Sequence, residues 1–130
     1  ISQLKKIQKF IKKRNNIAEI YKKKFDLDQI KIQSFDKSFY SSYHLFIILV
    51  PRKLRNALFD YLRKFFFVNV HYIPLFYHPV YNFKSKSKFS NAIDYYQKTI
   101  SIPIYYDLKI KDQLNVIKKI NSFLKKNIIN

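Results

Sequence analysis

The sequence contains three histidines, the side chains whose charge ordinarily changes nearest to neutral pH. His71 and His78 lie seven positions apart across a proline-containing segment, and His44 lies within a separate apolar run. A metal site would need further ligands, but the chain has no cysteine and only 8 acidic residues. We therefore expect no metal site. The apolar neighbours of His44 favour a histidine in the core or at an interface.

His71 is the strongest candidate for a ligand-facing group. It lies near the end of a predicted strand and is followed by a segment rich in aromatic side chains, namely Tyr72, Phe76, Tyr77 and Tyr81. Binding sites concentrate in such segments when a rigid scaffold holds them. Aromatic core packing at the same corner is an alternative that the sequence leaves open.

The absence of two residue types excludes several kinds of catalytic site. The chain has no glycine, so the glycine-rich phosphate loops of P-loop and dinucleotide-binding folds cannot form. It has no cysteine, which excludes thiolate nucleophiles and disulfides. Glu19 is the single glutamate and has apolar neighbours, so a hydrolase with paired carboxylates is not expected. Spacing alone assigns no catalytic residue.

The formal net charge of +18 indicates polyanions as one class of partner. Basic and aromatic residues interleave between positions 77 and 89, a pattern suited to clamping single-stranded nucleic acid. A basic nucleic-acid-binding module is therefore an alternative function, although the RNP, KH and zinc motifs are missing. The excess of 22 lysines over 4 arginines, with abundant Ile, Asn, Phe and Tyr, also matches AT-rich codon usage. We favour this compositional origin of the charge.

Hydrophobic periodicity predicts alternating helices and strands. A long amphipathic helix is predicted over residues 1–26, followed by a polar segment with a short strand at 30–32. Ser90 is the predicted N-cap of a later helix. The remaining predicted strands are residues 43–50, 68–73 and 99–104, and the remaining predicted helices are 54–65, 90–98 and 114–128.

This order predicts an α+β fold with a single domain over residues 1–130, in which helices cover a small sheet of about three strands. The longest apolar run is residues 45–50, far shorter than the roughly 18 residues of a membrane-spanning helix, so no membrane partner is expected. The chain begins with Ile1 and contains no methionine. We therefore expect it to be a fragment of a longer polypeptide.

Five segments resemble, in order and spacing, the C-terminal part of one enzyme family. They are residues 41–46 (SSYHLF), 58–63 (LFDYLR), 68–74 (VNVHYIP), 78–81 (HPVY), and 91–92 (NA) leading to 100–105 (ISIPIY). Similar segments occur in the DegT/DnrJ/EryC1/StrS sugar aminotransferases, and the resemblance extends over residues 3–126. Residues 1–26 are similar to the long interdomain helix of that family.

The resemblance implies the small C-terminal domain of a fold type I aminotransferase. Such an enzyme holds pyridoxal 5'-phosphate (PLP) on a lysine and moves an amino group from glutamate to a nucleotide-linked 4-keto-6-deoxy sugar, a precursor of surface polysaccharides or nonulosonic acids. The cofactor-binding residues are expected in a missing N-terminal PLP domain. The chain alone is therefore expected to bind no PLP and to be inactive, and the parent enzyme is expected to be a cytoplasmic homodimer.

The resemblance also implies where this chain contacts the nucleotide-sugar substrate. The position of His71 matches a residue beside the sugar-nucleotide pocket, with Tyr72 and Tyr81 behind it and His78 in the same loop. These four residues are the predicted substrate-binding residues. No catalytic residue is expected among the 130.

Two departures from the family bear on activity. Relatives carry glycines at the turn that reads KFFF at residues 64–67 here, and Thr or Ser before the last helix, where this chain has Lys109. Each loss costs about 1 kcal/mol if the native backbone needs the missing residue. Either the backbone has adapted, or the chain is a decayed remnant without activity.

Overall fold

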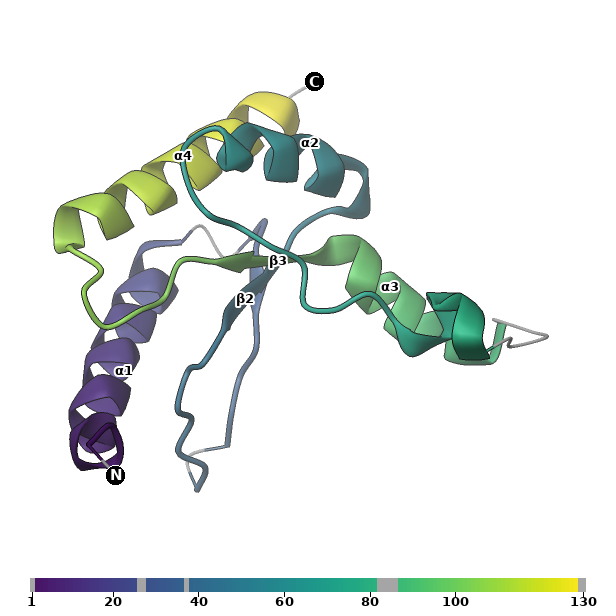
Figure 1. Cartoon of the computed structure of the whole chain (residues 1–130). Coiled ribbons are helices and arrows are strands. Elements are labelled where there is room, and N and C mark those ends of the chain that lie inside the picture. The colour runs from purple at the N-terminus through teal and green to yellow at the C-terminus, as the bar shows by residue number, and fades with distance from the viewer. Residues whose placement is uncertain (1, 26–27, 37, 82–86, 129–130) are drawn as a thin grey trace.

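The computed structural model describes residues 2–25, 28–36, 38–81 and 87–128. In this part of the chain, a three-stranded antiparallel sheet carries three helices on one face, and a fourth helix extends to the side (Figure 1). The α+β fold predicted from the sequence is confirmed.

The sheet consists of β1 (Lys31–Ile32), β2 (Phe46–Leu49) and β3 (Thr99–Ile102), in the order β1-β2-β3. β2 and β3 pair with Ile48 opposite Ile100 and Ile47 opposite Ser101. Side chains alternate between the two faces of a strand. Ile48 and Ile100 are fully buried in the core, so Ser101 lies on the opposite face of the sheet.

Four α-helices follow the predicted order. They are α1 (Ile7–Lys24), α2 (Arg52–Arg63), α3 (Ser90–Lys98) and α4 (Ile110–Ile128). Short 3-10 turns are found at Leu4–Lys6, Leu75–Tyr77, Pro79–Tyr81 and Ser87–Phe89. Among the residues that the structure describes, no helix combines the length and the apolar character needed to cross a lipid bilayer.

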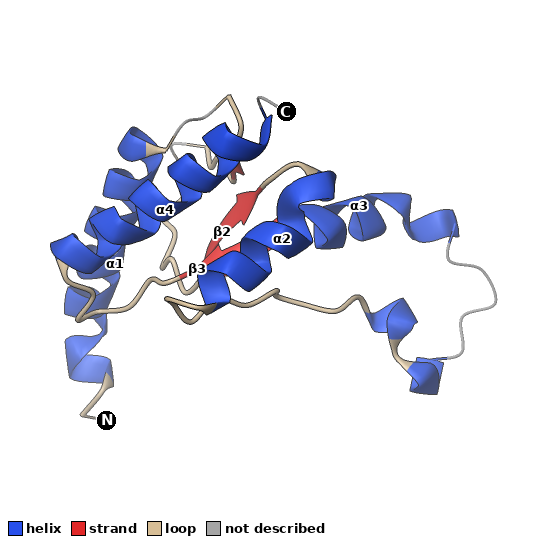
Figure 2. Ribbon diagram, turned by 90° about the horizontal axis from the view of Figure 1, so that it is seen from above, coloured by secondary structure: helices blue, strands red, loops and turns tan. Residues whose placement is uncertain are grey.

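The core lies between the sheet and the layer formed by α1, α2 and α4. Figure 2 shows α1 and α4 next to each other on the left of the strands, α2 crossing over β3, and α3 on the right. α1 contributes Tyr21, whose ring stacks on Phe25 and contacts Phe46 of β2. Leu62 of α2 and Ile120 of α4 complete the packing. Burying a side chain of this size stabilises the fold by about 1.5–3 kcal/mol.

The apolar stripe of α1 is only partly covered. Ala18, Tyr21 and Phe25 are buried, but Leu4 and Ile7, which belong to the same predicted stripe, are exposed. The N-terminal turns of this helix therefore present apolar side chains to solvent.

The predicted strand at residues 68–73 is wrong. Only Asn69 pairs with β3, in an isolated bridge to Ser101, although Val68 is buried in the core. Pro103, which would lie opposite Phe67, has no N–H to extend the pairing in that direction. Residues 70–73, in the other direction, form no bridge to β3. The third strand of the sheet is β1 instead.

Element boundaries also differ from the prediction. The residue that precedes α3 as N-cap is Phe89 and not Ser90, and no side chain caps this helix. α4 begins at Ile110, four residues before the start that the apolar periodicity predicts and directly after Lys109, as the family resemblance implies. Asp112 lies in its first turn, where a negative charge interacts favourably with the helix dipole. β3 ends at Ile102, since Pro103 cannot continue the ladder.

The glycine-free turn after α2 adopts ordinary backbone conformations. Lys64 has φ −71°, and Tyr43 is the one residue with a positive φ in the described part of the chain. No residue of the KFFF turn is therefore forced into the left-handed region. The backbone of this turn therefore has no need of glycine's left-handed conformation.

Candidate functional site

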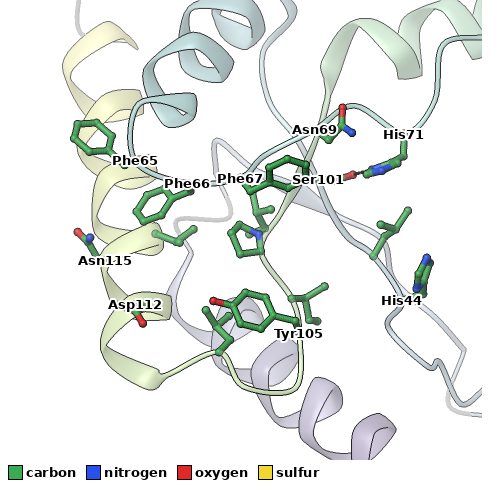
Figure 3. Close-up of a pocket in the computed structure, with 16 residues that line it drawn as sticks. His44, Phe65, Phe66, Phe67, Asn69, His71, Ser101, Tyr105, Asp112 and Asn115 are labelled. Atoms are coloured by element: carbon green, nitrogen blue, oxygen red, sulfur yellow. Dashed lines mark hydrogen bonds between the residues drawn. The ribbon is translucent and has the colours of Figure 1, made fainter. Parts of the chain in front are cut away.

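His71 lies beside β3 because the preceding residues are bound to that strand. The Asn69 N–H donates to the Ser101 carbonyl oxygen at 3.2 Å, and the Ser101 N–H donates to the Asn69 carbonyl oxygen at 2.7 Å. Two residues further on, His71 Nδ1 lies 2.8 Å from Ser101 Oγ (Figure 3). The imidazole is half-buried and is held against the face of the sheet that points away from the helical core.

A pocket of about 670 Å³ lies where β3 leaves the sheet. Asn69, His71 and Ser101 contribute to it from one side, and Asp112 and Asn115 of α4 contribute from the other (Figure 3). An apolar wall comes from the turn after α2 and from the segment after β3, including the residues Phe65, Phe66, Phe67, Pro103 and Ile104. The pocket thus combines a few polar groups with a mainly apolar lining, which is the usual composition of a small-molecule site.

The wall of this pocket is anchored from the core. The Tyr21 hydroxyl donates to the carbonyl oxygen of Pro103 at 2.8 Å. Burial raises the pKa of the Tyr21 phenol well above its ordinary value, because a buried phenolate would lose its hydration. The phenol therefore stays a hydrogen-bond donor at neutral pH and fixes the segment that follows β3.

His44 is the residue that sequence reasoning placed differently. It precedes β2, is exposed, and lines the same pocket as His71 (Figure 3). A position in the core is therefore wrong, and a position at an interface stays a prediction. The polar residues Ser41 and Ser42 just before it were the signal that the chain is still outside the strand here.

α1 holds the segment that carries His44. Arg14 Nε donates to the Ser42 carbonyl oxygen at 2.8 Å, and Asn15 Nδ2 donates to the Ser41 carbonyl oxygen at 2.9 Å. Tyr43 has φ 43° and a buried ring over which the Lys22 ammonium lies, 5.2 Å from the centroid. This long helix thus positions one wall of the pocket in addition to covering the sheet.

The other three predicted substrate-binding residues do not line the pocket. The Tyr72 ring meets the His71 ring edge-on at 4.7 Å between centroids, yet the Tyr72 side chain is 71% exposed. His78 and Tyr81 are exposed on the 3-10 turns that follow. The structure therefore brings Tyr72 to His71, and it leaves His78 and Tyr81 on an open surface. Their substrate contacts remain predictions.

Part of the aromatic segment packs internally. Phe76 is buried and stacks on Phe89 with 4.7 Å between ring centroids, and the Tyr77 ring lies 6.1 Å from that of Tyr96 on α3. The alternative of aromatic packing holds for these residues. The His71 ring has both kinds of contact, the edge-on Tyr72 ring and the Ser101 hydroxyl, so for this residue both interpretations stay open.

The described lining of the pocket does not suit PLP. No lysine or arginine is among the described residues that line it, so they offer neither an amine for a Schiff base nor a cation for the phosphate group. Asp112 is the single carboxylate among these residues, and its charge disfavours an anion nearby. The arrangement suits a neutral, hydroxyl-rich ligand portion better than a phosphate.

Comparison with known proteins assigns the chain to a family. The sequence matches the DegT/DnrJ/EryC1/StrS aminotransferase family over residues 1–121. It is 33% identical over 135 residues to the UDP-4-amino-4,6-dideoxy-N-acetyl-beta-L-altrosamine transaminase of Campylobacter jejuni, covering 97% of this chain and 35% of that protein. The motifs at residues 70–74 and 78–79 resemble the pseudaminic acid pathway transaminase within the family, and this relative agrees with that resemblance.

Solved structures share the fold. PseC of Helicobacter pylori, an aminotransferase involved in the biosynthesis of pseudoaminic acid, matches with a TM-score of 0.82 and 25% identity over 96% of this chain and 35% of that one. Spr1654 of Streptococcus pneumoniae, solved in its PLP-form, matches with a TM-score of 0.87 and 23% identity over 96% of this chain and 34% of that one. The chain spans about a third of the length of these relatives, and it belongs to the DegT/DnrJ/EryC1/StrS aminotransferase family.

Proposed function

We propose that the chain is the C-terminal small domain of a PLP-dependent aminotransferase, which transfers an amino group from glutamate to a nucleotide-linked 4-keto-6-deoxy sugar. The observation that carries this proposal is the pocket beside β3, in which His71 is oriented by a buried serine on a scaffold that the family shares. The resemblance to the Campylobacter jejuni relative favours a UDP-linked hexosamine as the sugar.

In this proposal, the cofactor belongs to a PLP domain that precedes the chain. The lining of the pocket supports this division, because it offers neither the amine nor the cation that PLP needs. PLP supplies the amino-transfer chemistry where it is bound. The residues of this chain bind and orient the sugar, and none of them is assigned a catalytic role.

The polar groups of the pocket suit sugar hydroxyls. A neutral imidazole donates one hydrogen bond from its protonated nitrogen, and Asn115 offers both a donor and an acceptor. We propose that His71 donates to a hydroxyl or a phosphate oxygen of the nucleotide sugar. We favour the hydroxyl, since strong phosphate recognition would call for a cationic group that the lining lacks. Tyr72, His78 and Tyr81 would then contact more distant parts of the substrate.

We also propose a cytoplasmic homodimer for the parent enzyme. Three exposed apolar side chains are Leu4 in the 3-10 turn before α1, Ile7 at the start of α1, and Phe67 in the turn after α2, which is 80% exposed. Large exposed apolar side chains of this kind suit an interface with the PLP domain or a second subunit.

The test is a chimaera in which this chain replaces the matching third of the Campylobacter jejuni transaminase. We expect the chimaera to aminate the UDP-linked 4-keto sugar with glutamate as donor and to melt cooperatively. A chimaera that folds, binds PLP and reacts with glutamate but leaves the sugar unchanged would contradict the proposed function. That result would favour the decayed remnant.

A further inference from the structure

Ser101 is the one side chain that hydrogen-bonds with the His71 ring in the described part of the chain. The two residues lie 30 positions apart, and the contact joins Ser101 Oγ to His71 Nδ1. The other ring nitrogen, Nε2, has no hydrogen-bond partner among the described residues. The ring is therefore held at one nitrogen and free to bind at the other.

The Ser101 hydroxyl is a fixed point. Ser101 belongs to β3 and is only 6% exposed. Its backbone N–H and carbonyl groups both form hydrogen bonds with the backbone of Asn69. Asn69 is two residues before His71, so the same ladder that places Ser101 also places the backbone of the histidine. The relative position of hydroxyl and imidazole thus depends on three hydrogen bonds and not on a mobile surface contact.

The direction of the hydrogen bond follows from burial. A serine hydroxyl has one hydrogen to donate, and a buried donor without an acceptor is costlier than an unused lone pair. His71 Nδ1 is the one acceptor that the described residues place at Ser101 Oγ. A hydroxyl that donates to Nδ1 leaves the proton of the neutral ring on Nε2.

We propose that Ser101 is a positioning residue for His71, which fixes both the orientation of the ring and the tautomer in which Nε2–H donates to an oxygen atom of the nucleotide sugar. The identity of the ligand rests on the proposed function. The orientation and the tautomer rest on the contacts of this chain alone.

Thr99 provides a matched control. It lies two residues before Ser101 on the same face of β3 and is fully buried, but its hydroxyl has no hydrogen-bond partner among the residues that the structure describes. Thr99→Val removes this hydroxyl at nearly constant shape. Ser101→Ala removes the hydroxyl that contacts His71, and Ser101→Thr retains a hydroxyl there.

The direct test is long-range ¹H–¹⁵N correlation NMR of the histidine side chains at about pH 8.5, where imidazoles are ordinarily neutral. Because the chain has only three histidines, substituting each one in turn assigns its side-chain resonances. The exposed His78 serves as an internal reference for an imidazole that exchanges freely between tautomers. In the unmodified chain, we expect His71 Nε2 to resonate as a protonated nitrogen and Nδ1 as a bare, hydrogen-bonded one.

In Ser101→Ala, we expect the ¹⁵N chemical shifts of both His71 ring nitrogens to move toward those of His78. In Ser101→Thr, we expect these chemical shifts to return to their original values, and in Thr99→Val we expect no change. A His71 spectrum that is unchanged by Ser101→Ala overturns the proposal. If Ser101→Ala does not fold, the spectrum of the unmodified chain decides, because a proton on Nδ1 overturns the proposal and a bare Nδ1 supports it.

The chimaera separates this inference from the proposed function. We expect Ser101→Ala to lower the rate of the nucleotide-sugar half-reaction about two- to tenfold without changing the glutamate half-reaction. If His71→Ala also leaves the sugar half-reaction unchanged, the proposed function is wrong, whereas the NMR result still decides the role of Ser101. If His71→Ala slows that half-reaction and Ser101→Ala does not, the positioning role is wrong.

Discussion

At the scale of single residues, the free nitrogen of His71 gives the site its most specific test. In the chimaera, we expect His71→Ala to slow the nucleotide-sugar half-reaction about 5- to 150-fold, because losing one buried hydrogen bond to the ligand costs about 1–3 kcal/mol. The half-reaction with glutamate and the affinity for PLP should not change. Rapid-mixing absorbance measurements of the two half-reactions provide both rates.

The alternative for His71 is a purely structural role beneath Tyr72. In that case, alanine would lower the melting temperature and reduce both half-reactions equally. Tyr72→Ala is the matched control, since it removes the ring that contacts His71 and leaves the bond to Ser101 in place.

Tyr21 allows a prediction about stability and pH. Tyr21→Phe keeps the ring but leaves the Pro103 carbonyl oxygen without this donor, so we expect the free energy of unfolding to fall by about 1–2 kcal/mol at pH 7. Because burial raises the pKa of the folded phenol, the unfolded state loses its proton first as the pH rises. The stabilising effect of the hydroxyl is therefore present below about pH 10 and declines above it.

Urea unfolding of both proteins between pH 7 and 11 measures this difference. We expect the stability gap between the unmodified chain and Tyr21→Phe to narrow at the alkaline end. A gap that stays constant up to pH 11 would contradict a raised pKa at Tyr21.

The sequence identified His71 from its position before an aromatic segment, but it could not identify the partner. Ser101 is distant in sequence, and its contact arises only because Asn69 pairs with β3. The alternation of polar and apolar residues from Thr99 to Ile102 was a usable signal, since it predicts that Ser101 faces away from the core. His44 was misassigned because apolar neighbours indicate burial of a segment and not of each of its residues.

At the scale of elements, Gln113 joins the first and last helices. It is 1% exposed, and its Nε2 donates to the Ile17 carbonyl oxygen at 2.6 Å. We expect Gln113→Ala to lower the free energy of unfolding by about 2 kcal/mol, through the lost bond and the cavity that remains. Asn115→Ala, at an exposed position on the same helix, should change it by less than about 0.5 kcal/mol. Equal effects in chemical denaturation would show that Gln113 does not link the helices.

Helices were predicted better than strands for a physical reason. The 3.6-residue pattern is a local property, and it predicted the existence of α1, α2, α3 and α4. Strand formation depends on a partner elsewhere in the chain. Residues 68–73 have the composition of a strand but find a single pairing position beside β3, whereas the polar segment around β1 finds a full partner in β2.

At the scale of the whole molecule, the chain is expected to remain without PLP. We expect that this chain, mixed with PLP and dialysed, retains no absorbance of a Schiff base, because its lysines are abundant but its pocket contains none. Exposed lysines react reversibly, so borohydride trapping should label many of them at low occupancy. A stable band that one lysine substitution abolishes would contradict the prediction and would require a cofactor site in this chain.

The family assignment could be predicted from sequence because five short motifs occur in the order and spacing of the family. The arrangement of the sheet could not, since β1 is two residues long and its pairing with β2 leaves no local pattern. The sequence also could not show whether the turn at residues 64–67 tolerates the absence of glycine. Whether glycine was needed there depended on backbone angles that only the structure supplies.

The left-handed backbone conformation of Tyr43 affects how strongly the pocket can bind a ligand. A tyrosine in this region of backbone conformation is destabilised by about 1 kcal/mol or more. Contacts with α1 offset this strain, because side chains of α1 donate to the carbonyl groups of Ser41 and Ser42 and Lys22 lies over the Tyr43 ring. The direction of the next residue, His44, is thereby set while the chain folds. This side of the pocket is therefore preorganised. A ligand does not have to order this wall when it binds, so the binding free energy contains no entropy cost for that ordering.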